Sequence, residues 1–271
     1  MTAKNEFRRR EAWFSEISLP VETCVAKCYE NGFDARAGQW IIYFTSDMAR
    51  MNPLSVLVPE EAIEAALEGD RVYLDERKLQ IGHKSYQAGI PIENLQRSGQ
   101  LDSVVLQQNQ QRLLSNIKLF GRHSVVKDLV SGCKTQQNIL SPVERLIVDF
   151  PPDLNLLKSW VGAGEGLTPS FDDFLAGMLL ADRRSGRNCL EIPADFFAEI
   201  AGKTTAQSLQ QLCFAAEGYL NLQTEVLVDK LMSCSVSSAE IVRVMHQGHS
   251  SGTDILCGIW YFLEHSGFFA R

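Results

Sequence analysis

The stretch that decides the fold is Ser170-Phe-Asp-Asp173-Phe-Leu-Ala-Gly177, and Ser251-Gly-Thr-Asp254-Ile-Leu-Cys-Gly258 repeats its outline. Both have a Ser, an Asp three residues later, a Leu two residues after that, then a small residue and a Gly. Each follows a glycine-bearing polar loop and precedes an apolar segment. The pattern predicts two helix starts, in which the Ser hydroxyl caps the backbone N–H three residues on and the Asp completes a capping box.

The residues alone leave two alternatives open at these starts. Thr168 can cap the first helix instead, with Pro169 as the first helical residue and Ser170 free for a ligand. Both segments can also be ordinary capped core helices, whose Gly177 and Gly258 merely allow close packing. The glycine-rich approach to both helices favours the ligand-binding interpretation for the pair.

A helix start behind a glycine loop is a natural anion site. Its free N–H groups and partial positive charge attract anions, and glycine lets the backbone come close to the ligand. We therefore expect phosphate or carboxylate to bind here. The expected anion-binding residues are Gly164, Gly166, Thr168, Ser170, Gly248, Ser250, Ser251 and Gly252. A helix expected from Lys203 adds Thr205 and Ser208, although solvent exposure is the favoured explanation of its polar start.

Three carboxylates, those of Asp172, Asp173 and Asp254, lie near the expected anion and require a compensating positive charge. Either they cap their own helices, or a hard cation such as Mg²⁺ bridges them to the ligand. Adjacent helical residues point about 100° apart, so Asp172 and Asp173 are expected to have different roles. We assign Asp172 to the ligand as a catalytic residue, and Asp173 and Asp254 to helix capping or a metal. Asp172→Ala should then abolish activity with little loss of melting temperature.

His249 is the candidate proton-transfer group. It precedes a helix start, where the helix dipole favours a neutral imidazole that can act as a base near pH 7. The alternative is a loop histidine that caps or packs. His83, His123 and His265 are isolated in the sequence, and we assign them no role.

Composition restricts the partners of the chain. The 271 residues are 45% hydrophobic and carry a net charge of −7, which disfavours a nucleic-acid surface because phosphate contacts need clustered Lys and Arg. Neither a membrane-spanning apolar stretch nor a secretory signal is apparent, so we expect a cytoplasmic protein without a membrane partner. The seven scattered cysteines are expected to be reduced thiols.

The pattern of apolar residues along the sequence changes near residue 105. Before it, short β-branched and aromatic runs occur at 40–44, 54–58, 71–74 and 79–81, interrupted by one helix between Pro59 and Gly69. After it, helical patterns are expected at 106–120, 142–149, 153–161, 170–184, 194–201, 203–221, 224–233, 238–247 and 251–265. We therefore expect an α+β protein with a small, mainly β lobe at 1–105 and a larger α-helical bundle at 106–271 that carries the site.

Several motifs over residues 160–262 are specific, and they are Gly166-Leu-Thr-Pro-Ser-Phe-Asp-Asp173, Thr204-Thr-Ala206, Gly218-Tyr219 and Gly248-His-Ser-Ser-Gly252 with Asp254. Together they closely resemble the AllH-like family, long described only as a domain of unknown function. One departure is Phe171, where we expect a smaller or polar residue in many relatives, so the ring is expected to narrow the cavity and change the substrate. The first 150 residues show little beyond a β-rich character that matches the family.

The resemblance implies a subunit of an oxamate carbamoyltransferase of allantoin and purine catabolism, an assembly of three subunits. That enzyme interconverts oxalurate and phosphate with oxamate and carbamoyl phosphate. We expect carbamoyl transfer by positioning and charge stabilisation, without a covalent enzyme intermediate. Two alternatives remain open: a non-catalytic anion-binding subunit of that assembly, and a stand-alone metal-dependent hydrolase.

Overall fold

The computed structural model describes residues 6–10, 13–93, 102–131 and 150–268. The chain divides into two compact units, Met1–Gln96 with Leu220–Gln223 and Arg97–Tyr219 with Thr224–Arg271. We refer to them as the barrel unit and the helical unit. That they are independent domains divided near residue 105 remains a prediction.

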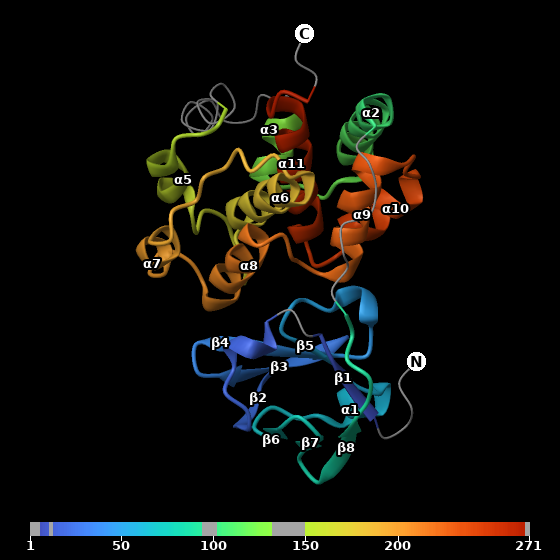
Figure 1. Ribbon diagram of the computed structural model, residues 1–271, viewed down its shortest axis with the longest axis vertical. Helices are drawn as coiled ribbons and strands as arrows, with labels where there is room; N and C mark the ends of the chain where they lie inside the picture. The colour runs from blue at the N-terminus through green and yellow to red at the C-terminus, as the bar shows by residue number, and fades with distance from the viewer. Residues whose placement is uncertain (1–5, 11–12, 94–101, 132–149, 269–271) are drawn as a thin grey trace. The chain divides into compact units, whose positions relative to one another are not determined.

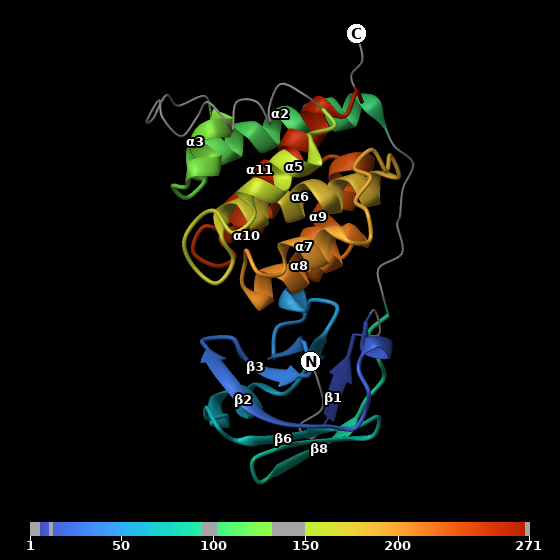
Figure 2. The ribbon, with the colours of Figure 1, turned by 90° about the vertical axis from the view of Figure 1, so that its left-hand side faces the viewer.

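The barrel unit contains a closed barrel of eight strands in the order β1-β5-β4-β3-β2-β6-β7-β8. Its strands are β1 (Glu6–Arg9), β2 (Val21–Tyr29), β3 (Gly32–Ala37), β4 (Trp40–Thr45), β5 (Ser55–Leu57), β6 (Arg71–Leu74), β7 (Lys78–Ile81) and β8 (Lys84–Ala88). The barrel closes through β1, which pairs in parallel with β8 and antiparallel with β5. The strands surround a common interior (Figures 1 and 2), and the helix α1 (Glu60–Ala65) follows β5.

Large apolar side chains fill the interior of the barrel unit. Phe33 and Phe44 are fully buried, and their rings stack with centroids 4.6 Å apart. Ile42 and Leu74 are also fully buried. Burial of a side chain of this size contributes about 2 kcal/mol relative to leaving it in water, so these residues account for a substantial part of the stability of the unit.

The expected fold class is wrong for this part of the chain. A small, mainly β lobe was expected from four apolar runs, whereas eight strands close into a barrel. The missed strands β1, β2, β3 and β8 carry polar and charged residues on their outward side, so they contain no long apolar run. Closure also depends on β1 pairing with β5 and β8, which are distant in sequence and leave no local signal.

The helical unit contains nine described helices, of which α3 was not expected from the sequence. They are α2 (Ser103–Phe120), α3 (Val125–Ser131), α5 (Leu154–Trp160), α6 (Ser170–Ser185), α7 (Phe196–Ile200), α8 (Ala206–Ala216), α9 (Leu222–Ser233), α10 (Ser238–Met245) and α11 (Ser251–His265). The first residues of α9 fall in the barrel unit. The helix expected at 142–149 lies outside the described residues.

The core of the helical unit is built around the pair α6 and α11, which lie side by side in both views (Figures 1 and 2). The two backbones touch at one glycine on each helix. A Cβ on Gly177 would lie 2.1 Å from the carbonyl oxygen of Ile255, and one on Gly258 would lie 1.9 Å from that of Phe174. Neither position can hold a larger residue without separating the helices, so the close-packing interpretation of these two glycines is correct.

The predicted capping boxes are wrong at both helix starts. Pro169 is the N-cap of α6 and Ser250 is the N-cap of α11, and neither helix has a side-chain cap hydrogen bond. Thr168 is therefore not the N-cap either. Ser170 and Ser251 are the first helical residues, so their hydroxyls are available for contacts outside their own helix.

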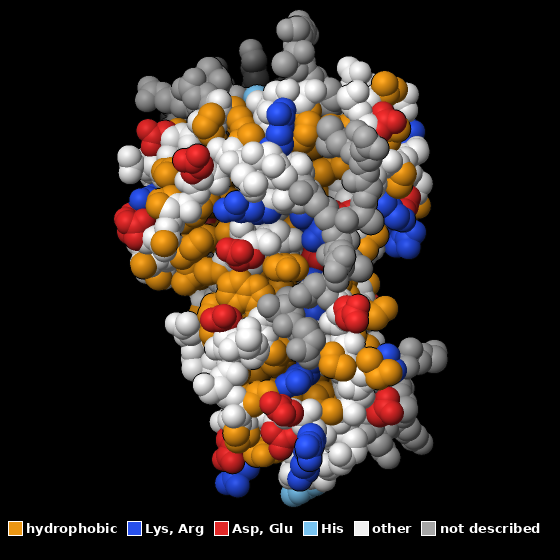
Figure 3. Space-filling model, in the orientation of Figure 1, with side chains coloured by type: hydrophobic (Ala, Val, Ile, Leu, Met, Phe, Trp, Pro, Cys, Tyr) orange, Lys and Arg blue, Asp and Glu red, His pale blue; other side chains and the backbone are white. Residues whose placement is uncertain are grey.

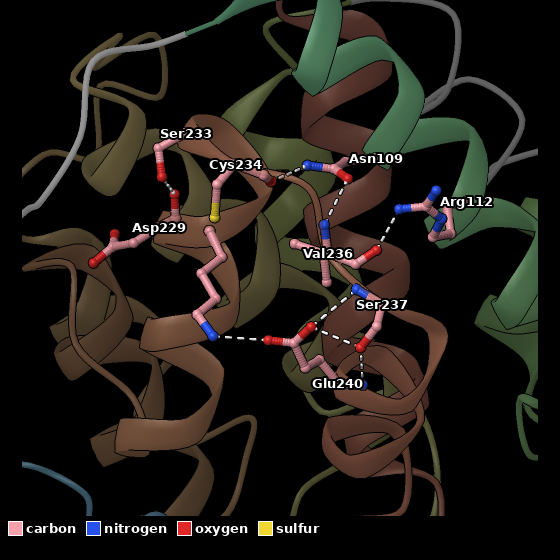
Figure 4. A network of polar contacts seen from close by, with 9 residues as sticks. Asn109, Arg112, Asp229, Ser233, Cys234, Val236, Ser237 and Glu240 are labelled. Carbon is pink, nitrogen blue, oxygen red and sulfur yellow. Dashed lines mark hydrogen bonds and ion pairs between the residues drawn. The ribbon is translucent and has the colours of Figure 1, made fainter.

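A polar network joins α2 to α9 and α10 (Figure 4). The Asn109 side chain donates to the carbonyl oxygens of Leu231 and Cys234 at 3.0 and 2.7 Å, and it accepts from the Val236 N–H at 3.1 Å. A capping box between Ser237 and Glu240 begins α10. Because buried amides need partners, this network fixes how α2 lies against the two helices.

The surface drawn in Figure 3 carries acidic and basic side chains interspersed over each unit. Within the described part of the chain, no helix combines the length and the apolar composition needed to cross a bilayer.

Candidate functional site

The two helix starts open onto one cavity of about 880 Å³ in the helical unit. Its walls come from residues in the segments 123–126, 160–171 and 248–251, and from Gln207. This volume is within the usual range of small-molecule sites. We call it the helix-start cavity.

A direct contact joins the two motifs at the cavity. The hydroxyl oxygens of Thr168 and Ser251 lie 2.9 Å apart, and both residues line the walls. Of the site residues expected from the sequence, the structure brings eight to the cavity, seven expected to bind the anion and the expected catalytic His249. They are Gly164, Gly166, Thr168, Ser170, Gly248, His249, Ser250 and Ser251.

The loop before α6 is held close to the helix start by its glycines. Gly164 has a φ of 121°, and a Cβ there would lie 2.5 Å from the backbone nitrogen of Ser170. A side chain at this position would therefore be strained and would obstruct the helix start. The N–H of Phe171 donates to the carbonyl oxygen of Ala163, and those of Asp172 and Asp173 donate to that of Pro169, so these three groups are not free to contact a ligand.

Two buried carboxylates, Asp173 of α6 and Asp254 of α11, lie beneath the cavity wall and are fully shielded from solvent. The pKa of Asp173 is raised to about 7, mainly by burial and also by the charge of Asp254. Hydrogen bonds from Gln211, Ser251 and Thr168 lower this pKa and so limit the rise. Burial also raises the pKa of Asp254 to about 6, against hydrogen bonds from Ser124, Ser170 and Ser250.

For each carboxylate, one of the hydroxyls whose hydrogen bonds lower its pKa comes from the opposite helix start. Ser251 at the start of α11 acts on Asp173 of α6, and Ser170 at the start of α6 acts on Asp254 of α11. The Ser-x-x-Asp spacing thus links the two helices to each other instead of capping each one. The motif could be identified from the sequence, but this exchange between helices could not.

Asp172 lies away from the cavity and has a full set of partners. It is buried, and it accepts hydrogen bonds from the Gly162 N–H at 2.8 Å, from the Ser208 hydroxyl at 2.6 Å and from the Thr204 hydroxyl. It thereby ties the loop before α6 to the start of α8. The catalytic role expected for Asp172 stays a prediction, and its position does not support direct contact with a ligand in the cavity.

The polar start of α8 also faces the carboxylates of α6. Thr205 is the N-cap of α8 and accepts from the Ser208 N–H at 3.0 Å, and the Gln211 amide donates to Asp173 at 2.6 Å. Thr205 and Ser208 do not line the cavity, whereas Gln207 does. Gly252 is buried, and a Cβ there would lie 2.1 Å from the carbonyl oxygen of Val244, so this glycine serves helix packing.

His249 lies at the edge of the helix-start cavity, where it is exposed to solvent. A second histidine, His123, also lines the cavity, and its Nε2 lies 3.1 Å from a carboxylate oxygen of Asp128. Apart from these two histidines, the described lining residues include no basic side chain. The anion-attracting groups are therefore hydroxyls, helix-start N–H groups and histidines.

Two parts of the cavity wall, the segment 123–126 and Trp160, were not predicted from the sequence. Ser124 donates to Asp254, and Arg122, two residues earlier, donates to the Gly248 carbonyl oxygen at 3.1 Å. Trp160 and Phe171 form an aromatic wall with ring centroids 5.9 Å apart. The predicted narrowing by Phe171 is untested, although this buried ring does line the cavity. Nothing in the local pattern of 123–126 indicated a site, since its place depends on the packing of α3.

The donor set for a metal is limited. Among the described residues, three or more His, Cys, Asp or Glu side chains do not come together in a group able to hold a metal ion. Asp173 and Asp254 together with the neighbouring hydroxyls supply oxygen atoms only, which is the donor type preferred by hard cations.

None of the solved structures matches the chain. The family model described as oxamate carbamoyltransferase subunit AllH matches residues 160–263. Over that segment, which contains both helix starts, the chain resembles the AllH family as its motifs predicted.

Proposed function

We propose that this chain is a subunit of an oxamate carbamoyltransferase assembly and that the helix-start cavity binds the small anions of the reaction. One observation carries the proposal: the family match at 160–263 includes every residue that lines the cavity except those at 123–126. The proposed ligands are phosphate, carbamoyl phosphate, oxamate and oxalurate. The proposed partners are the other subunits of the assembly, in the cytoplasm.

The reaction transfers a carbamoyl group between nitrogen and oxygen. A phosphate oxygen forms a bond to the carbamoyl carbon of oxalurate, and the bond from that carbon to the amide nitrogen breaks. The departing nitrogen takes a proton and leaves as oxamate, while carbamoyl phosphate forms. The protein must therefore hold two anions together, stabilise charge at the carbamoyl oxygen and supply one proton.

The walls of the cavity offer groups for each of these tasks. The starts of α6 and α11 supply the positive ends of two helix dipoles, which attract the phosphate or the carboxylate. The hydroxyls of Thr168, Ser170 and Ser251 are hydrogen-bond donors at the same starts. His249 can carry the proton, because an imidazole can act as a general acid or base and this one lines the cavity.

The proposal is tested by reconstitution. The chain is purified alone and with its partner subunits, and carbamoyl phosphate formed from oxalurate and phosphate is measured. We expect turnover from the assembly, and we expect His249→Ala to lower kcat by about a hundredfold or more, as removal of a general acid does. The matched control is His246→Ala, since His246 ends α10, is exposed and lies outside the cavity lining.

The outcomes separate the catalytic role from the alternative. Loss of turnover in His249→Ala with an intact assembly supports catalysis in this chain. Unchanged turnover in His249→Ala, together with loss of substrate binding in Ser251→Ala, identifies a non-catalytic anion-binding subunit. A reconstituted assembly whose turnover does not require this chain would contradict the proposal.

A further inference from the structure

The carboxylates of Asp173 and Asp254 each have one oxygen that lacks a partner. Asp173 accepts from Gln211 through Oδ1, and Asp254 accepts from Ser124 through Oδ1. The Oδ2 atom of each is buried and has no hydrogen-bond partner among the described residues. Buried polar atoms almost always have partners, so two such atoms under one cavity call for an explanation.

The charges around this pair do not balance. No Lys or Arg among the described residues forms an ion pair with Asp173 or Asp254. Each helix start contributes roughly half a positive charge, so the two together offset about one of the two negative charges. About one negative charge is left beneath a cavity that, on the proposed function, binds anions.

A single bound proton would neutralise the remaining negative charge of the Asp173 and Asp254 pair, but it would leave no positive charge to attract an anion. A divalent cation would make the floor of the cavity positive by about one charge, on the same arithmetic. The anion-binding function therefore favours the cation over the proton. This choice rests on the proposed function.

We propose that Asp173 and Asp254 hold one hard divalent cation, of the Mg²⁺ class, between the starts of α6 and α11. The unpartnered Oδ2 atoms supply two carboxylate ligands, and the hydroxyls of Thr168, Ser170 and Ser251 supply neutral oxygens on the cavity side. Such cations keep several waters and bind through one or two carboxylates together with substrate phosphates. The cation thus forms the floor on which the substrate anion rests.

The test uses the full chain, stripped of metals with a chelator at about pH 8, where both carboxylates are ionised. Mn²⁺ is titrated as the spectroscopic probe, and Mg²⁺ is tested by competition. We expect one saturable site per chain, with at least tenfold weaker binding in Asp173→Asn and in Asp254→Asn. The control is Glu191→Gln, which removes an exposed carboxylate outside the cavity lining and should bind as the wild type does.

The variants should fold, because each removes a buried charge. We expect the melting temperatures of both Asn variants in chelator to equal or exceed that of the wild type. A wild-type measurement gives a second test: Mn²⁺ affinity should fall between about pH 8 and about pH 5, since binding requires ionised carboxylates. Lack of a saturable site, or equal affinity in the wild type and both variants, would overturn the cation site.

Phosphate binding separates this inference from the proposed function. Inorganic phosphate that binds only in the presence of Mg²⁺ supports both. Equally tight phosphate binding in chelator leaves the proposed function standing and overturns the cation as the floor of the anion site. Cation binding without any phosphate binding supports the cation site and contradicts the proposed function.

Discussion

The hydroxyl oxygens of Thr168 and Ser251 lie 2.9 Å apart, which brings two residues from separate motifs into hydrogen-bond contact at the wall of one cavity. This contact joins the start of α11 to the loop that leads into α6. Because both hydroxyls also act on Asp173, the cavity wall and the buried carboxylates beneath it form one connected group.

Ser251→Ala and Thr168→Val should each weaken phosphate binding by about tenfold or more. The reason is that a hydrogen bond to a charged group contributes about 1.5 to 3 kcal/mol. Isothermal titration calorimetry of the full chain measures this effect. Ser159→Ala is the control, since its hydroxyl bonds to the Leu156 carbonyl oxygen on the exposed side of α5. Wild-type affinity in both cavity variants would exclude the hydroxyl pair from the binding site.

Gly177→Ala should lower the free energy of unfolding by about 3 kcal/mol. The added Cβ would lie 2.1 Å from the carbonyl oxygen of Ile255, so α6 and α11 must separate. Chemical denaturation measures the loss. Gly202→Ala is the matched control because nothing lies within 4 Å of its added Cβ. Equal stability of the two variants would mean that the helices do not cross at Gly177.

Stability without bound cations should fall as pH rises from about 4 to about 7. Burial raises the pKa values of Asp173 and Asp254 above the ordinary value of 3.8, so the folded chain binds these protons more tightly than the unfolded chain. The stabilisation from these two bound protons is fully present below about pH 4 and is lost as pH rises through 6 and 7. One charged group in the region of these carboxylates is Lys127. It lies close to Cys257, which is also near Asp254, and its ammonium group donates to the Gly121 carbonyl oxygen.

Melting temperatures measured in chelator across this pH range check the effect. Asp173→Asn should flatten the fall, because the variant has no proton to lose at that position. If the wild type and Asp173→Asn lose stability in parallel as pH rises, other groups are responsible for the pH dependence.

Asp172→Ala should destabilise the chain by about 3 kcal/mol, because one buried and two partly buried donors lose their acceptor. This expectation from the geometry is opposite to the one drawn from the sequence, which was a loss of activity with little loss of stability. Denaturation of the variant beside Glu165→Ala, an exposed carboxylate nearby, decides between them. An unchanged free energy of unfolding with abolished activity would support the assignment from the sequence.

The helix starts could be predicted because the signal is local, whereas their role as one binding site stays a prediction. The Ser-x-x-Asp frame and its glycine loops marked the starts of α6 and α11, and the structure brings both to one cavity. What each Ser does could not be predicted. Its partner is a carboxylate of the other helix, which depends on how Gly177 and Gly258 let the helices cross.

The barrel and the segment 123–126 were missed for a related reason. Val21 and Val25 are the buried residues of β2, and its other side chains resemble those of a polar loop. β1 completes the barrel by pairing with strands about 50 and 80 residues away, as in Arg8 with Leu57 and Phe7 with Ala88. Ser124 likewise joins the site only through its hydrogen bond to Asp254, 130 residues further along the chain.

The central claim is that the starts of α6 and α11 bind one anion between them. A crystal structure of the chain soaked with carbamoyl phosphate and Mg²⁺ tests it most directly. We predict phosphate density in the helix-start cavity, in contact with the hydroxyls of Thr168 and Ser251 and between the loops of Gly166 and Gly248. Density for the ligand elsewhere on the chain, with this cavity holding only water, would contradict it.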